Sequence, residues 1–200
     1  MMKTIAFFET TKAEEHFLRK RIGKNFTLQF FQETIQDVPV KKFAKADILS
    51  VFIYSVVKKN LIRSMKHLSL IATRSTGFNH IDIHEATKRS VAVVNVPYYG
   101  ENTVAEHTFA LILSLSRNIH KAYVRTLRND FSLEGLRGFD LKGKTLGVIG
   151  AGSIGLHVIK MAKGFGLKVI AYDLKQNHFL ADTLDLTYEP LDELLSRSDI

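Results

Sequence analysis

Short runs of apolar, β-branched residues alternate along the first half of the chain with segments of helical spacing. The candidate strands cover residues 3–8, 26–31, 47–53, 68–73 and 91–96, and segments rich in Lys, Glu and Leu, such as KAEEHFLRKRI, separate them. This alternation predicts a parallel sheet that helices cover on both faces. Pro97 ends the last run, because proline cannot donate a hydrogen bond to a strand ladder.

A longer helical pattern begins near residue 101. Apolar residues three and four positions apart, Val104, Leu111, Ile112, Leu115 and Ile119 among them, predict one stripe on a single helix over about residues 101–129. Further apolar residues lie on the other faces of its first half, so we expect that half to be buried between two bodies. The Gly-rich, charged stretch NDFSLEGLRGFDLKGK then reads as a connection, and the strand–helix pattern restarts at TLGVIG. We expect a domain over residues 1–100 and a second over 101–200, with the long helix bridging them.

The last residues, LDELLSRSDI, predict a short helix followed at Asp199 and Ile200 by the start of a strand. A sheet that ends on an exposed, unpaired edge is prone to aggregation. We therefore expect the chain to be cut within a longer domain. The predicted fold class is α/β, with two doubly wound parallel-sheet domains, one flavodoxin-like and one Rossmann-like, the second incomplete.

Composition narrows the function classes. Hydrophobic residues make up 46% of the chain and charged residues 24%, as in a globular protein. Cysteine is absent, so we expect no disulfide, no thiolate metal site and no cysteine nucleophile, and we predict no other metal ligand. The net charge of +8 comes from small scattered basic groups with no interleaved aromatic residues, a pattern that does not favour nucleic-acid binding. The apolar runs are too short for a signal peptide or a membrane span. We expect a soluble cytoplasmic protein.

The stretch TLGVIGAGSIG contains the pattern G-x-G-x-x-G at Gly150, Gly152 and Gly155, directly after a predicted strand and at the start of a predicted helix. In this pattern the first glycine permits a tight turn, the second lets the backbone approach a pyrophosphate, and the third lets the helix pack closely on the strand. The N–H groups of Ser153 and Ile154 then face the anion from the positive end of the helix.

The next predicted strand ends in Asp173, 18 positions after Gly155. An acidic residue at this place accepts hydrogen bonds from the ribose hydroxyls of NAD and repels the additional phosphate of NADP. The glycine pattern alone is weak, but here it coincides with a strand before it, a helix after it, a second strand and a terminal acid. NAD is therefore the predicted cofactor, although Lys175 would allow contact with the phosphate of NADP.

The segment RSTGFNHIDIHEATKRSVAVVNVPYYGENTVAEHTFALILSLSRNIHKAY, together with FSLEGLRGFDLKGKTLGVIGAGSIG, resembles the D-2-hydroxyacid dehydrogenases, and within them the D-lactate dehydrogenase branch. The resemblance implies that the backbone at Thr76 and Gly77 binds the carboxylate of a small 2-oxo or 2-hydroxy acid; the alternative for Gly77 is a simple turn glycine. It also implies that Tyr99 lines the substrate cleft, where the alternative is a core aromatic residue.

In this family a His paired with a Glu, and an Arg, perform catalysis, and the resemblance places all three downstream of this chain. We expect no catalytic residue here, and we interpret His107 as structural, because its neighbour Glu106 points about 100° away on a helix. The remaining histidines are expected at surface or boundary positions. The implied function of the complete protein, an expected homodimer, is NADH-dependent reduction of pyruvate to the D-2-hydroxy acid, with this chain alone inactive. The alternatives are a glyoxylate or hydroxyisocaproate reductase, or a non-catalytic protein that senses NAD(H).

Overall fold

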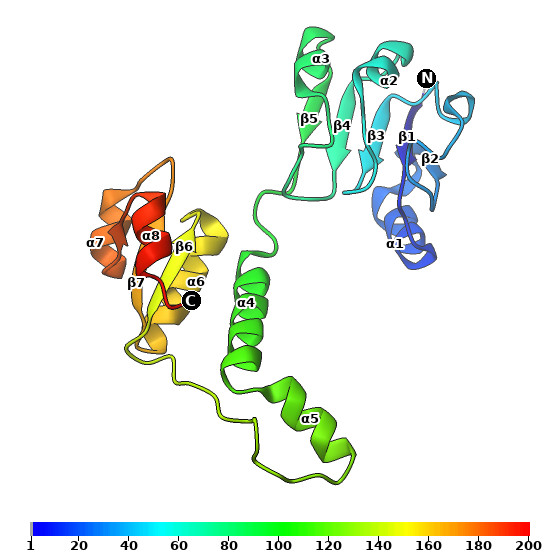
Figure 1. Cartoon of the computed structure of the whole chain (residues 1–200). Coiled ribbons are helices and arrows are strands. Elements are labelled where there is room, and N and C mark those ends of the chain that lie inside the picture. Colours follow the sequence, from blue (N-terminus) through cyan, green and yellow to red (C-terminus); the bar gives the residue numbers. More distant parts are fainter. Residues whose placement is uncertain (1) are drawn as a thin grey trace. The chain divides into compact units, whose positions relative to one another are not determined.

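The computed structural model describes residues 2–200 and consists of two compact units, the first ending at Tyr99 and the second beginning at Gly100 (Figure 1). Each unit has its own parallel sheet and its own hydrophobic core. The fold is therefore mixed α/β, as the alternation of strand and helix patterns predicts. No helix within residues 2–200 combines the length and apolar character that crossing a bilayer requires.

The first unit is built on a five-stranded sheet in the order β2-β1-β3-β4-β5. All of its strand pairs are parallel. The strands are β1 (Lys3–Phe7), β2 (Phe26–Phe30), β3 (Ile48–Val51), β4 (Leu70–Thr73) and β5 (Ala92–Val94), and the helices are α1 (Lys12–Ile22), α2 (Lys59–Ser64) and α3 (Ile83–Lys88), with short 3-10 turns at Gly23–Asn25 and Val40–Lys42. All five predicted strands are present, each slightly shorter than its apolar run.

Local sequence explains why these elements form where they do. Helix α1 begins with a capping box, in which the Thr11 hydroxyl accepts from the Glu14 N–H and the Glu14 carboxylate accepts from the Thr11 N–H. The strands carry nearly continuous apolar runs because both faces of a parallel sheet are covered. Ala6, Leu49 and Ile71 accordingly have no exposed surface.

The second unit begins with α4 (Glu101–Ser116) and α5 (Ile119–Leu127), followed by a connection without regular structure. Three parallel strands in the order β6-β7-β8 form its sheet. Its remaining elements are β6 (Thr145–Ile149), α6 (Ser153–Gly164), β7 (Lys168–Tyr172), α7 (His178–Leu184), β8 (Thr187–Tyr188) and α8 (Leu191–Arg197). The two-residue strand β8 is too short to have produced a pattern in the sequence.

The residues after α8 lie along β6. The Asp199 N–H donates to the Thr145 carbonyl at 2.9 Å, and the Gly147 N–H donates to the Ile200 carbonyl at 2.9 Å. These bonds use the edge of β6 that faces away from β7, because β7 receives the hydrogen bonds of the alternate residues. They agree with the strand that the sequence predicts to begin at Asp199.

The prediction of one helix over residues 101–129 is wrong. Asn118 separates α4 from α5 in a left-handed conformation, with φ 52° and ψ 34°. Asparagine tolerates this region because its short amide forms local hydrogen bonds. Here the Asn118 side chain donates to the carbonyls of Leu136 and Arg137 in the following connection, which compensates for the interruption.

Within the second unit, α4 buries only one of its apolar faces. Leu111 and Leu115 are 54% and 67% exposed, whereas Ala105 and Phe109 are buried. Phe109 stacks on Phe165, which directly follows α6, with ring centroids 5.1 Å apart. The face of α4 that packs on α6 is therefore the one that contains Ala105 and Phe109. Because α4 is apolar on several faces, spacing alone could not select this one.

Helix α6 packs so closely on the end of β6 that the contact leaves no room for a side chain at Gly155. A Cβ atom built on Gly155 would lie 2.0 Å from the Gly150 carbonyl oxygen, a backbone atom that cannot rotate away. Gly164, the last residue of the same helix, has nothing within 4 Å of an added Cβ. The two glycines of one helix thus differ in steric freedom.

Gly155→Ala should lower the free energy of unfolding of the second unit by about 1–3 kcal/mol, the usual range for overpacking, despite the higher helix propensity of alanine. Gly164→Ala is the matched control, and we expect it to be neutral or to stabilise by up to ~1 kcal/mol. Calorimetry of both variants measures the difference. Equal stability of the two variants would show that the close contact at Gly155 does not limit the packing of α6.

Candidate functional site

The glycine turn between β6 and α6 presents an open backbone surface. Gly150 has φ +95°, a conformation that L side chains rarely adopt, and a Cβ on Gly152 would meet no atom within 4 Å. Gly152 caps α6 without any side-chain hydrogen bond. The N–H groups of Ser153 and Ile154 come first in this 12-residue helix and have no intrahelical acceptor. This geometry suits an anion bound against the backbone.

Asp173 follows β7 and lies against the same turn. Its Oδ2 accepts a hydrogen bond from the Ala151 N–H at 2.8 Å, and its Oδ1 accepts from the Lys175 N–H at 2.8 Å. Each carboxylate oxygen has a second lone pair, so the side chain retains the capacity to accept from hydroxyl groups. The structure therefore brings together the six residues that the sequence singles out for the cofactor, which are Gly150, Gly152, Ser153, Ile154, Gly155 and Asp173.

In the first unit, the loop that follows β4 has its carbonyl groups fixed by hydrogen bonds. The Ser75 carbonyl accepts from the Val96 N–H at 3.1 Å, and the Thr76 carbonyl accepts from the Asn95 amide at 2.8 Å. The Gly77 carbonyl accepts from the Ser75 hydroxyl at 2.7 Å. Three consecutive carbonyl groups are thus directed towards protein donors.

In a trans peptide the carbonyl and the next N–H point in opposite directions. Fixing the carbonyls of residues 75–77 therefore turns the N–H groups of Thr76, Gly77 and Phe78 away from those donors. Within residues 2–200, no hydrogen bond uses these three N–H groups, and all three residues are exposed. The loop offers consecutive free donors, which is an arrangement that a carboxylate can use.

The two interpretations of Gly77 differ in what they require of the backbone. A turn glycine is needed where φ is positive or where a Cβ would clash. Gly77 is not among the glycines with positive φ, and a Cβ built on it would meet nothing within 4 Å. The protein itself therefore gives no steric reason for glycine here, whereas a ligand approaching the peptide would.

Tyr99 is 62% exposed, so it is not a core aromatic residue. His107 on α4 is also exposed, and the Glu106 carboxylate accepts from the Asn102 amide. The structure gives Glu106 and His107 no hydrogen bond to each other, in agreement with their adjacent positions on a helix. No group of three His, Cys, Asp or Glu side chains suited to a metal ion occurs within residues 2–200.

Arg74, which no sequence motif singled out, joins the carboxyl ends of three strands. Its guanidinium donates to the Phe8 and Glu9 carbonyls at 2.8 and 2.9 Å and to the Ser50 hydroxyl at 3.1 Å. Burial lowers the pKa of Arg74, and the carboxylates of Glu14 and Glu9 partly oppose that shift. In the sequence, the one signal for this role is a charged residue placed directly after an apolar strand.

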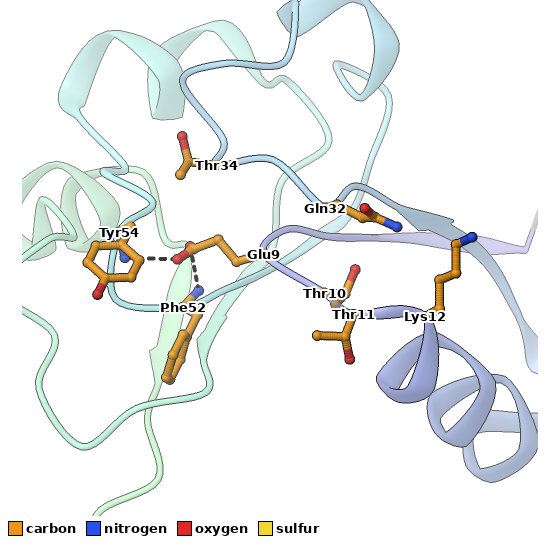
Figure 2. Close-up of a pocket in the computed structure, with 8 residues that line it drawn as sticks. All are labelled: Glu9, Thr10, Thr11, Lys12, Gln32, Thr34, Phe52 and Tyr54. Atoms are coloured by element: carbon orange, nitrogen blue, oxygen red, sulfur yellow. Dashed lines mark hydrogen bonds between the residues drawn. The ribbon is translucent and has the colours of Figure 1, made fainter.

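Glu9 was missed as well, and no feature of the sequence marks it. It has a positive φ of 54°, and its carboxylate accepts from the N–H groups of Phe52 and Tyr54 at 3.1 and 2.9 Å. Figure 2 shows these two bonds at one side of a pocket of about 600 Å³ at the carboxyl ends of β1, β2 and β3. The pocket is lined by Glu9, Thr10, Thr11, Lys12, Gln32, Thr34, Phe52 and Tyr54.

Several known proteins resemble this chain in sequence and in fold. D-lactate dehydrogenase from Escherichia coli K12 is 33% identical over 199 residues, which is 98% of this chain and 60% of that protein. An aromatic 2-oxoacid reductase from Clostridium sporogenes is 37% identical over 187 residues, covering 88% of this chain and 56% of the relative. The solved D-lactate dehydrogenase from Aquifex aeolicus, complexed with NAD and lactic acid, superposes with a TM-score of 0.91 at 35% identity, covering 98% of this chain and 58% of that structure.

The chain thus spans about 60% of the length of the curated relatives that it matches. The sequence profile of the D-isomer specific 2-hydroxyacid dehydrogenases, catalytic domain, matches residues 5–186. This match agrees with the resemblance carried by the glycine turn, the strand before Pro97 and the helix that begins at Glu101. The chain belongs to the D-isomer specific 2-hydroxyacid dehydrogenase family.

Proposed function

We propose that this chain supplies the substrate-binding domain, over residues 1–100, and the first half of the NAD-binding domain, over residues 101–200, of a D-2-hydroxyacid dehydrogenase. The reaction is the NAD-dependent reduction of a small 2-oxo acid, in the first place pyruvate, to the D-2-hydroxy acid. The observation that carries the proposal is the open glycine turn with Asp173 bonded to it. The NAD and lactic acid bound by the Aquifex aeolicus relative support it.

The residues of the turn fit the two parts of NAD that they would hold. The free space at Gly152 admits a pyrophosphate, and the N–H groups of Ser153 and Ile154 would donate to it. Asp173 would accept from the ribose hydroxyls through its remaining lone pairs. When bound, the nicotinamide cofactor supplies or accepts the hydride at C2 of the acid. The contribution of this chain is to hold and orient the adenosine end.

At the substrate end, the outward N–H groups around Thr76 and Gly77 would bind the carboxylate of the 2-oxo acid. Backbone N–H groups held in place beforehand bind an anion without paying for reorganisation. Tyr99, exposed at the end of the first unit, would line the cleft beside the substrate. This assignment keeps Thr76, Gly77 and Tyr99 in the roles that the resemblance implies.

A larger 2-oxo acid is the second candidate substrate, since the Clostridium sporogenes relative is named for aromatic 2-oxo acids. Non-catalytic sensing of NAD(H) is the alternative from another function class. Both alternatives use the same turn and Asp173. They differ from the leading proposal in turnover and in the acid that is reduced, so an assay with several acids separates them.

We also propose that the protein acts in the cytoplasm as a homodimer. Helix α5 and the residues after it expose Ile119, Tyr123, Leu127, Phe131 and Leu133, each by more than half. Apolar side chains exposed along one segment are typical of a contact between subunits, and a second copy of the chain would cover them. Sedimentation equilibrium tests the proposed homodimer, and a monomer at every concentration would contradict it.

Asp173→Ala should weaken NADH binding roughly 10- to 100-fold, the equivalent of losing one hydrogen bond to a charged acceptor, and should reduce the preference for NADH over NADPH. Because Asp173 also accepts from the Ala151 N–H, Asp173→Asn is the matched control. It keeps an acceptor for the turn and removes the charge. Fluorescence titration with both cofactors measures the effect. An Asn variant with unchanged affinity for both cofactors would exclude Asp173 from cofactor selection.

The 200-residue chain by itself should not turn over 2-oxo acids. Within residues 2–200 no histidine forms an ion pair with a carboxylate, so none is arranged as the proton donor that the family's His–Glu pair provides. The check is NADH oxidation by the purified chain with pyruvate and with larger 2-oxo acids. A rate near the ~10 per second of a typical enzyme would contradict the prediction. His107 would then be the first residue to substitute.

A further inference from the structure

A row of hydrogen bonds connects the His80 ring to the loop that follows β4. His80 Nε2 lies 3.1 Å from the Thr73 hydroxyl oxygen, and that oxygen lies 2.6 Å from the Ser75 hydroxyl oxygen. The Ser75 hydroxyl in turn donates to the Gly77 carbonyl at 2.7 Å. Thr73 and Ser75 are buried, with 2% and 3% exposure, so water does not replace these partners.

Counting protons gives every bond in the row one direction. A carbonyl oxygen accepts only, so the single Ser75 hydroxyl proton is used on Gly77. The Thr73 hydroxyl must therefore donate to Ser75, and its oxygen must accept from His80. The proton of the neutral His80 ring then has to be on Nε2. The geometry alone selects this tautomer.

The backbone of His80 is held in place as well. Its carbonyl accepts from the Val57 N–H at 2.8 Å, and Val57 and Ile81 form an isolated parallel bridge. Burial lowers the pKa of His80, with the Glu9 carboxylate opposing the shift, and a lowered pKa favours the neutral ring. A neutral His80 ring whose backbone is held in this way presents its Nε2–H donor in a fixed position.

We propose that His80 is a positioning residue for the substrate carboxylate. Through Thr73 and Ser75 it holds the Gly77 carbonyl inward, and so it directs the Phe78 N–H outward beside those of Thr76 and Gly77. The inference rests on the proposed function, since it concerns the loop that would bind the 2-oxo acid. His80 itself does not touch the acid; it acts through the two hydroxyl groups.

The first test is spectroscopic and does not depend on any ligand. Long-range ¹H–¹⁵N correlation of the 200-residue chain at neutral pH reports which ring nitrogen of each histidine carries the proton. We expect His80 to show the Nε2–H tautomer. The Nδ1–H tautomer would reverse the donor order at Thr73 and overturn the proposal.

The second test compares pyruvate binding, followed by the amide shifts of residues 76–78, in the native chain and its variants. His80→Leu removes the donor and should weaken pyruvate binding about three- to tenfold, the range for losing one buried hydrogen bond. His80→Gln places an amide N–H near the position of Nε2 and should bind within about twofold of the native chain, a margin below one hydrogen bond. His84→Leu, an exposed histidine on α3, is the matched control and should change nothing.

A double-mutant cycle separates a connected row of bonds from a general loss of packing. Thr73→Val removes the middle hydroxyl, so Thr73→Val and His80→Leu together should weaken binding no more than either alone. Additive losses, or native affinity in His80→Leu, would overturn the positioning role. Absence of pyruvate shifts at residues 76–78 in the native chain would instead overturn the proposed substrate loop, while the tautomer result would still stand.

Discussion

The contact between α6 and the end of β6 is the constraint on which the second unit depends. The Gly150 carbonyl occupies the space that any side chain at Gly155 would need. The helix can therefore begin directly beside the strand, and its first N–H groups lie next to an open turn. Asp173 completes the arrangement by accepting from the Ala151 N–H, which fixes the turn to the following strand. One close approach thus sets both the packing of α6 and the position of its first N–H groups beside the turn.

In the first unit, side chains satisfy the backbone carbonyls at the carboxyl ends of the strands. The carboxyl ends of its strands lack further ladder partners, and Arg74 satisfies the carbonyls of Phe8 and Glu9 there. The next loop has its carbonyl groups bonded inward, and this leaves its N–H groups directed outward. Both units therefore present backbone donors at the carboxyl ends of parallel strands, where ligands bind in open α/β folds. The glycine turn of the second unit suits a pyrophosphate, and the loop after β4 in the first unit suits a carboxylate.

Sequence reasoning predicted what depends on local pattern. The apolar runs gave all five strands of the first sheet, and the spacing of three glycines with one acid gave a turn whose residues do meet. It could not predict what depends on tertiary contacts. The helix break at Asn118 needs two carbonyls from a connection near Leu136, and the buried face of α4 is decided by the stacking of Phe109 on Phe165. His80 and Arg74 act through partners supplied by the fold, so their residue types alone did not reveal them.

We propose that the glycine turn binds a dinucleotide rather than serving only as a tight connection. Gly152 separates these two roles, because a Cβ built there meets no protein atom within 4 Å, whereas a branched side chain would enter the space proposed for the pyrophosphate. The most direct measurement is NADH binding by Gly152→Val, with circular dichroism and thermal unfolding recorded in parallel. We expect an unchanged fold and the loss of NADH binding. Native affinity for NADH in a folded variant would contradict it.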